Sequence, residues 1–111
     1  MTQKIQKTKK KGQSKGDTVG NSQRTEALCQ AFLLLDDKTE VKGFLRDLLT
    51  EPELVELGNR FYAARMLAQG VHYTAIAEDT GLSSRTIARV QHWRKEGMGG
   101  YRMVLSRLKK R

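Results

Sequence analysis

The stretch from Thr74 to Gly97, TAIAEDTGLSSRTIARVQHWRKEG, constrains the fold more than any other part of the chain. Ile76 falls on one face of a first short helix, and Ile87 and Val90 share a face of a second. Between them stands Gly81, and a residue without Cβ can adopt the positive φ angle of a sharp turn. This spacing predicts a helix-turn-helix, whose second helix enters the DNA major groove. A plain amphipathic helical hairpin is the alternative that so short a motif leaves open.

The residues around the expected turn fit the same unit. Ala77 is small enough to let two helices cross closely, and we expect Leu82 to pack beneath the turn. The hydroxyl of Ser83 or Ser84 can accept a hydrogen bond from a free backbone N–H in the first turn of the second helix. The second helix is therefore predicted to begin at this pair of serines.

Length and composition favour one small helical domain. The chain has 111 residues and a single proline, and its apolar residues recur at helical spacing, which predicts an all-α fold. No segment approaches the ~18 uninterrupted apolar residues of a membrane span, and no apolar segment follows the N-terminal lysines as in a secretory signal. The single Cys29 cannot form an intrachain disulfide, and we expect it to be a small core residue. These features agree with a reducing cytoplasm.

Positive charge is concentrated at the two ends of the chain, whose net charge is +9. Residues 1–24 hold seven basic residues against Asp17, residues 25–82 hold five basic and ten acidic residues, and residues 83–111 hold nine basic residues against Glu96. The second basic segment begins where the expected recognition helix begins, as is typical of nucleic-acid-binding proteins. Binding to a membrane surface, the competing interpretation, needs a broad exposed apolar face. We expect the apolar residues of this end to be buried: Tyr101, Met103, Val104, Leu105 and Leu108.

We expect residues 1–22 to form a disordered basic tail and residues 23–111 a helical DNA-binding domain, with the helix-turn-helix at about 73–96. The tail has almost nothing to bury, so folding could not offset its ordering entropy. It is either a solvated tail or a basic arm that adds nonspecific phosphate contacts.

The sequence predicts four further helices, at about Glu26–Leu35, Thr39–Leu49, Thr50–Ala68 and Tyr101–Lys109. The third of them begins with a pattern typical of a capping box, in which Thr50 and Glu53 exchange hydrogen bonds with each other's backbone N–H. The first is apolar on most of its sides, and such a helix needs burial on most sides. In so short a chain a partner subunit is the expected source of that burial, which predicts a homodimer.

The second motif helix and its flanks hold the candidate DNA-contacting residues. Side chains at the start of such a helix touch base edges, and the start of the first motif helix meets the DNA backbone. The candidates are Thr74, Ser83, Ser84, Arg85, Thr86, Ala88, Arg89 and His92. Arg85 either pairs with a guanine through two hydrogen bonds or contacts only phosphate, and both interpretations stay open.

No pattern indicates an enzyme, a metal site or a cofactor. His72 and His92 are 20 residues apart and Cys29 lies in an expected core helix, so no metal-ligand spacing exists. No nucleophile is paired with a base, and we expect Glu78 and Asp79 to lie on the exposed face of the first motif helix. The expectation is a non-enzymatic protein without a cofactor.

Several runs of the chain resemble the tryptophan repressor superfamily. The runs are Leu48–Glu53 (LLTEPE), Leu57–Arg60 (LGNR), Gly81 and Thr86–Arg89 (TIAR). A TIxRV-type helix followed by glycines and a GY pair, here Thr86–Val90 and Gly100–Tyr101, is similar to the YerC/YecD-like branch. The resemblance covers about Glu26–Leu108. It implies a six-helix domain that forms an intertwined homodimer and places two recognition helices in successive major grooves.

The resemblance also implies where a corepressor would bind. Arg60 and Arg89 match two arginines that flank the amino acid in tryptophan-binding members, and Thr86 matches a pocket threonine. The chain departs from that pattern with Val90 in place of a glycine and Trp93 in place of a small serine. Because Trp93 follows Arg89 by four residues on the same helical flank, its indole either fills the corepressor slot or packs against the third helix.

Together these patterns predict a cytoplasmic, nucleoid-associated bacterial transcriptional regulator. We expect it to be a repressor that binds specific sequences of double-stranded DNA as a homodimer. We expect it to act without a tryptophan corepressor and not to bind a membrane. One alternative keeps the fold but adds control by an amino acid or another small metabolite near Arg60 and Arg89. Another is a structural or adaptor nucleic-acid-binding protein. A DNA-binding piece of a recombinase is disfavoured because several helices precede the motif.

Overall fold

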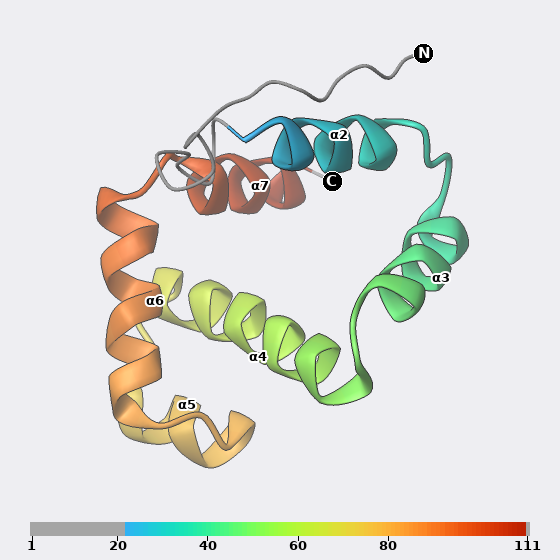
Figure 1. Cartoon of the computed structure of the whole chain (residues 1–111). Coiled ribbons are helices and arrows are strands. Elements are labelled where there is room, and N and C mark those ends of the chain that lie inside the picture. The colour runs from blue at the N-terminus through green and yellow to red at the C-terminus, as the bar shows by residue number, and fades with distance from the viewer. Residues whose placement is uncertain (1–21, 111) are drawn as a thin grey trace. The chain divides into compact units, whose positions relative to one another are not determined.

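The structure is a computed structural model that describes residues 22–110, and these residues form six α-helices and no strand (Figure 1). The helices are α2 (Gln23–Leu33), α3 (Lys38–Leu48), α4 (Glu51–Ala68), α5 (Tyr73–Thr80), α6 (Ser84–Glu96) and α7 (Gly100–Lys109). The all-α prediction is confirmed, with helix boundaries that shift by up to three residues. The predicted basic tail lies outside the described residues except for Ser22, whose hydroxyl caps α2.

The chain divides into two compact units after Leu45. In the first unit, the rings of Phe32 on α2 and Phe44 on α3 meet edge to face with centroids 5.3 Å apart. Neither helix has a buried residue, and Leu33 and Leu34 are 78% and 79% exposed. Cys29 is also exposed, so its prediction as a core residue is wrong. The reason is that the apolar sides of α2 have too few neighbours to cover them.

In the second unit, α4 starts at the predicted capping box. The Thr50 N–H donates to Glu53 Oε1 at 2.8 Å, and the Glu53 N–H donates to Thr50 Oγ1 at 3.3 Å. Pro52 stands in the first turn, where its missing N–H leaves no helical hydrogen bond unmade. These local rules therefore fix where the longest described helix begins.

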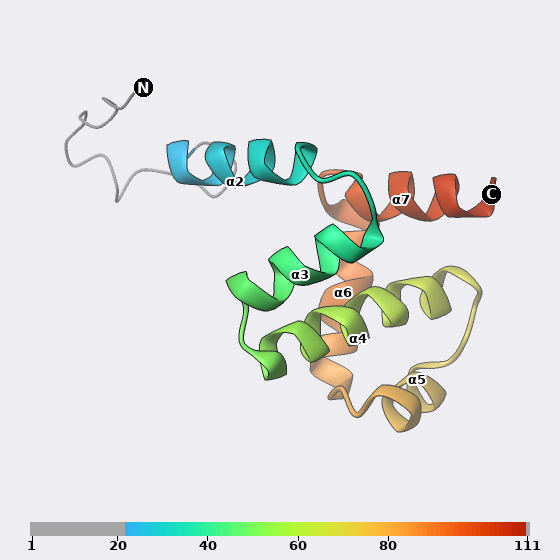
Figure 2. The same cartoon turned by 90° about the vertical axis from the view of Figure 1, so that its right-hand side faces the viewer.

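The core of the second unit lies where α4, α5 and α6 meet (Figure 2). Its buried residues are Ala63, Ala64 and Leu67 of α4, Ile76 of α5, and Ile87 and Val90 of α6. The two alanines have no side chain beyond Cβ, so α6 can cross α4 closely. Ile87 and Ile76 are the largest fully buried side chains. This core holds the two motif helices against α4.

The last helix, α7, is less buried than its sequence suggests. Tyr101 and Leu105 pack against the core as partly buried residues. Met103, Val104 and Leu108, which were expected to be buried with them, are about half exposed. That prediction is wrong for these three residues, because the contacts of α7 with α4 and α6 leave their side chains partly uncovered.

Candidate nucleic-acid interface

Helices α5 and α6 form a helix-turn-helix, and Figures 1 and 2 show α5 and the start of α6 at one end of the second unit. The turn begins at Gly81, whose φ of 79° and ψ of 1° place it in the left-handed region. Its N–H donates to the Ala77 carbonyl oxygen at 2.8 Å and so closes α5. Ile76, which precedes this turn in the sequence, and Ile87, which follows it, are both buried in the same core, as the motif spacing predicts.

Side-chain hydroxyls fix the rest of the turn. Thr80 Oγ1 donates to the Ile76 carbonyl oxygen at 2.7 Å and accepts from the Leu82 N–H at 3.1 Å. Ser83 Oγ accepts from the Thr86 N–H at 3.1 Å, so Ser83, rather than Ser84, caps α6. The part played by Thr80 was not predicted, although a threonine before a helix-ending glycine can bond to its local backbone in this way.

The eight predicted DNA-contacting residues all lie on α5, the turn and α6. Seven are exposed: Thr74, Ser83, Ser84, Arg85, Ala88, Arg89 and His92. Thr86 is half-buried, and its hydroxyl accepts from Ser83 Oγ at 3.1 Å. The helix-turn-helix therefore presents a polar surface opposite its apolar core.

The arginines of this surface form no ion pair with an acidic side chain of the described chain. Arg85 and Arg89 are exposed on α6, and the one ion pair among residues 22–110 joins Arg60 to Glu56 within α4. The free N–H groups at the start of α6 add the positive end of the helix dipole. Guanidinium groups beside a helix N-terminus are suited to binding phosphate oxygens.

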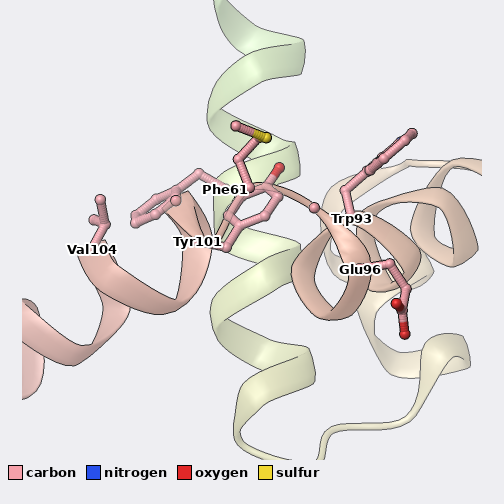
Figure 3. A pocket seen from close by; sticks show the side chains of 8 residues that line it. Phe61, Trp93, Glu96, Tyr101 and Val104 are labelled. Atoms are coloured by element: carbon pink, nitrogen blue, oxygen red, sulfur yellow. The ribbon is translucent and has the colours of Figure 1, made fainter.

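Trp93 lies at the wall of an apolar pocket of about 550 Å³ (Figure 3). The wall includes Phe61 of α4 and Tyr101 and Val104 of α7. Trp93 is 54% exposed, and its ring meets that of His92 edge to face at 4.7 Å. Of the four predicted ligand-pocket residues, Arg60, Thr86, Arg89 and Trp93, only Trp93 lines this pocket.

Arg60 is engaged on its own helix. Its Nη2 donates to Glu56 Oε2 at 2.8 Å. Its Nε is buried and has no hydrogen-bond partner within residues 22–110. The Nη2 group of this guanidinium is therefore paired, whereas its Nε group is an unsatisfied hydrogen-bond donor within the described residues.

A hydrogen bond that sequence reasoning missed joins α4 to α5. Tyr62 Oη donates to Asp79 Oδ2 at 2.8 Å, and this bond raises the pKa of Tyr62 above its usual value of 10.0. Asp79 lies on the exposed face of α5 as predicted, but it has a partner there. The two residues are 17 positions apart, so only the packing of α4 on α5 brings them together.

The described residues contain no cluster of three or more His, Cys, Asp or Glu side chains that could hold a metal ion. None of their helices is long and apolar enough to cross a membrane.

We predict that Gly81→Ala lowers the free energy of unfolding by about 1–2 kcal/mol, because a residue with Cβ is strained in the left-handed region. A Cβ at this position would meet no atom within 4 Å, so the cost is conformational rather than steric. Urea denaturation followed by circular dichroism measures it. Gly58→Ala in the interior of α4 is the matched control and should stabilise by about 0.5–1 kcal/mol. Equal effects of the two substitutions would contradict the strain at Gly81.

Comparison with known proteins identifies the family. A family model described as Trp repressor protein matches residues 23–109. The chain belongs to the Trp repressor family. It is 38% identical to the uncharacterized protein YerC of Bacillus subtilis (strain 168) over 84 residues, which are 76% of this chain and 81% of YerC. The predicted resemblance to the YerC-like members of the Trp repressor family is thus confirmed.

Solved structures of the Trp repressor family share the fold. A TrpR-like protein from Eubacterium eligens ATCC 27750 is 41% identical with a TM-score of 0.76, and the match covers 79% of this chain and 91% of that one. A candidate Trp repressor from Staphylococcus aureus is 33% identical with a TM-score of 0.74, and the match covers 79% and 88%. The Trp repressor family is a family of DNA-binding regulators, which agrees with the helix-turn-helix at α5 and α6.

Proposed function

We propose that this protein is a sequence-specific transcriptional regulator that represses by binding double-stranded DNA as a homodimer, without a tryptophan corepressor. The observation that carries the proposal is the helix-turn-helix, whose capped α6 exposes Arg85 and Arg89 without an acidic partner in the described chain. In this function the start of α6 lies in the major groove, where Ser83, Ser84 and Arg85 meet base edges. Thr74, at the start of α5, meets the DNA backbone.

The homodimer is supported by the apolar surface that the chain leaves uncovered. Leu33 at the end of α2 and Leu34 just after it are largely exposed, and Val104 and Leu108 on α7 are half exposed. Exposed apolar helix faces can mark interaction sites, and a second copy of the chain could cover these side chains. A dimer would also present two copies of α6 to the DNA. Sedimentation equilibrium should therefore report twice the monomer mass of 12.6 kDa.

Independence from tryptophan is supported by Trp93 and Arg60. An indole at position 93 stands where the tryptophan-binding members of the family have a small serine. Arg60, which matches a ligand arginine, is held by Glu56 on its own helix. Trp93 is bulkier than the serine it replaces, and Arg60 already has a carboxylate partner, so both positions are less suited to binding a free amino acid.

One observation favours a second candidate, a regulator controlled by a small anionic metabolite. The buried Arg60 Nε lacks a hydrogen-bond partner in the described chain, and a ligand carboxylate could accept from it. Isothermal titration calorimetry with L-tryptophan separates the two candidates. The first predicts no heat of binding at micromolar concentrations, and DNA affinity that tryptophan does not change. Micromolar binding would favour the metabolite-controlled regulator.

Selection of bound DNA from a random pool tests the main proposal. The expected product is a two-fold symmetric site whose halves lie about one helical turn, roughly 10 bp, apart. Enrichment of no sequence, together with equal binding to every competitor, would instead indicate a structural or adaptor nucleic-acid-binding protein.

A further inference from the structure

The hydrogen bond between Tyr62 and Asp79 is distinctive among residues 22–110, because no other side-chain pair there is hydrogen-bonded between two different helices. Tyr62 belongs to α4, which contributes half of the buried core, and Asp79 belongs to the first helix of the helix-turn-helix. The oxygen atoms are 2.8 Å apart, a good length for a hydroxyl that donates to a carboxylate. This bond therefore ties the DNA-binding motif to the body of the second unit.

Helix α5 has few other anchors. It is eight residues long, and isolated helices of that length are marginal in water. His72 at its N-cap makes no side-chain capping bond, and Ile76 is its one fully buried residue. Ile76 and the partly buried Ala77 beside it resist separation of α5 from the core, but these apolar contacts are not directional and resist rotation of α5 about its own axis much less. Asp79 lies almost one helical turn beyond Ile76, so a bond there opposes that rotation.

We propose that Tyr62 and Asp79 are positioning residues for DNA binding, which hold α5 in the orientation at which it can meet the DNA backbone while α6 lies in the major groove. This inference rests on the proposed DNA-binding function. Neither side chain needs to touch DNA. Their bond raises the fraction of molecules whose motif is ready to bind, and apparent affinity falls in proportion when that fraction falls.

The sign of one substitution separates positioning from simple electrostatics. Asp79 carries a negative charge beside a surface that binds phosphate, so electrostatics alone predicts that Asp79→Ala strengthens DNA binding. Positioning predicts the opposite sign. Glu78 is the matched control, because it is an exposed acid on the same helix and, unlike Asp79, its side chain forms no hydrogen bond with the described residues. Glu78→Ala removes the same charge without touching Tyr62.

The experiment measures affinity by fluorescence anisotropy, with a labelled duplex of mixed sequence, at a temperature where circular dichroism shows every variant folded. Tyr62→Phe and Asp79→Ala should each weaken binding, by at most roughly tenfold, which is the full contribution of one hydrogen bond. Glu78→Ala should leave the affinity unchanged or strengthen it. Asp79→Asn, whose amide oxygen can still accept from Tyr62, should recover most of the affinity. In the Tyr62→Phe background, Asp79→Ala should cause no further loss.

If the two residues served only stability, Tyr62→Phe and Asp79→Ala would lower the melting temperature and leave the DNA affinity of the folded protein unchanged. That result would overturn the proposal. Stronger binding by Asp79→Ala, equal to the gain from Glu78→Ala, would overturn it as well. Wild-type protein that binds no duplex at all would instead reject DNA binding itself, and the positioning role with it. Amide hydrogen exchange gives an independent reading: in Tyr62→Phe, the α5 amides should exchange faster while those of α6 keep their protection.

Discussion

Replacing Ile87 by alanine should lower the free energy of unfolding of this protein by about 2–5 kcal/mol, the cost of truncating a fully buried isoleucine. Ile87 is 0% exposed and lies in a core of six buried residues, three of which belong to α4. Two of these six are alanines, so few large side chains remain to fill the space that the substitution leaves. Small domains are stable by only about 5–15 kcal/mol, and this loss is a large part of that total.

Urea denaturation followed by circular dichroism measures the effect of Ile87→Ala. Ile87→Val should cost only about 0.5–1.5 kcal/mol, because it removes one methyl group from the same site. Val55→Ala on the exposed side of α4 should change stability by less than about 0.5 kcal/mol. If Ile87→Ala lowered the free energy of unfolding as little as Val55→Ala, the result would contradict the described packing of α6 against α4. Because Ile87 anchors α6, the same variant should also lose DNA binding where it is partly unfolded.

Local rules explain why the motif could be predicted from the sequence. The positions of Ile76, Ile87 and Val90 follow from helical periodicity, since one face of each helix must be apolar. The turn at Gly81 follows from the left-handed backbone that a glycine tolerates. Ser83 was one of two capping candidates, and only the geometry of the Thr86 N–H distinguishes it from its neighbour. Each of these features depends on a few adjacent residues.

Burial that depends on distant elements was predicted less well. Val104 and Cys29 stand in apolar segments, and the sequence alone suggests that such residues are buried. Both are exposed, because an apolar side chain is buried only where another element covers it. The bond between Tyr62 and Asp79 was missed for the same reason. Nothing within either helix marks its partner, since the pair is created by the packing of α4 on α5.

The candidate ligand site was assigned by resemblance to the family and stays a prediction. A resemblance assigned Arg60, Arg89 and Trp93 to one pocket by their positions in the family pattern. In the structure Trp93 lines an apolar pocket with Phe61 and Tyr101, and Arg60 pairs with Glu56. A comparison with the family pattern shows which residues differ from it. The contacts that each side chain makes are visible only in the structure.

Replacing Arg85 by alanine should weaken binding to the DNA site selected from a random pool by about 1–3 kcal/mol, roughly 5- to 150-fold in affinity. Arg85 is exposed in the first turn of α6, and no described acid forms an ion pair with it. From that place its guanidinium can donate two hydrogen bonds to the O6 and N7 atoms of a guanine. A second selection with the variant should show that one base position of the site has lost its preference.

Arg85→Lys and Lys109→Ala serve as controls for this prediction. Lysine keeps the charge but cannot form the planar two-pronged contact, so Arg85→Lys should also relax the base preference. Lys109 is exposed at the end of α7, and Lys109→Ala removes a positive charge far along the chain from the motif. It should change affinity for selected and mixed-sequence DNA alike, and only slightly. If Arg85→Ala weakened binding equally on both kinds of DNA and lowered the salt slope by about one, Arg85 would be a phosphate contact instead.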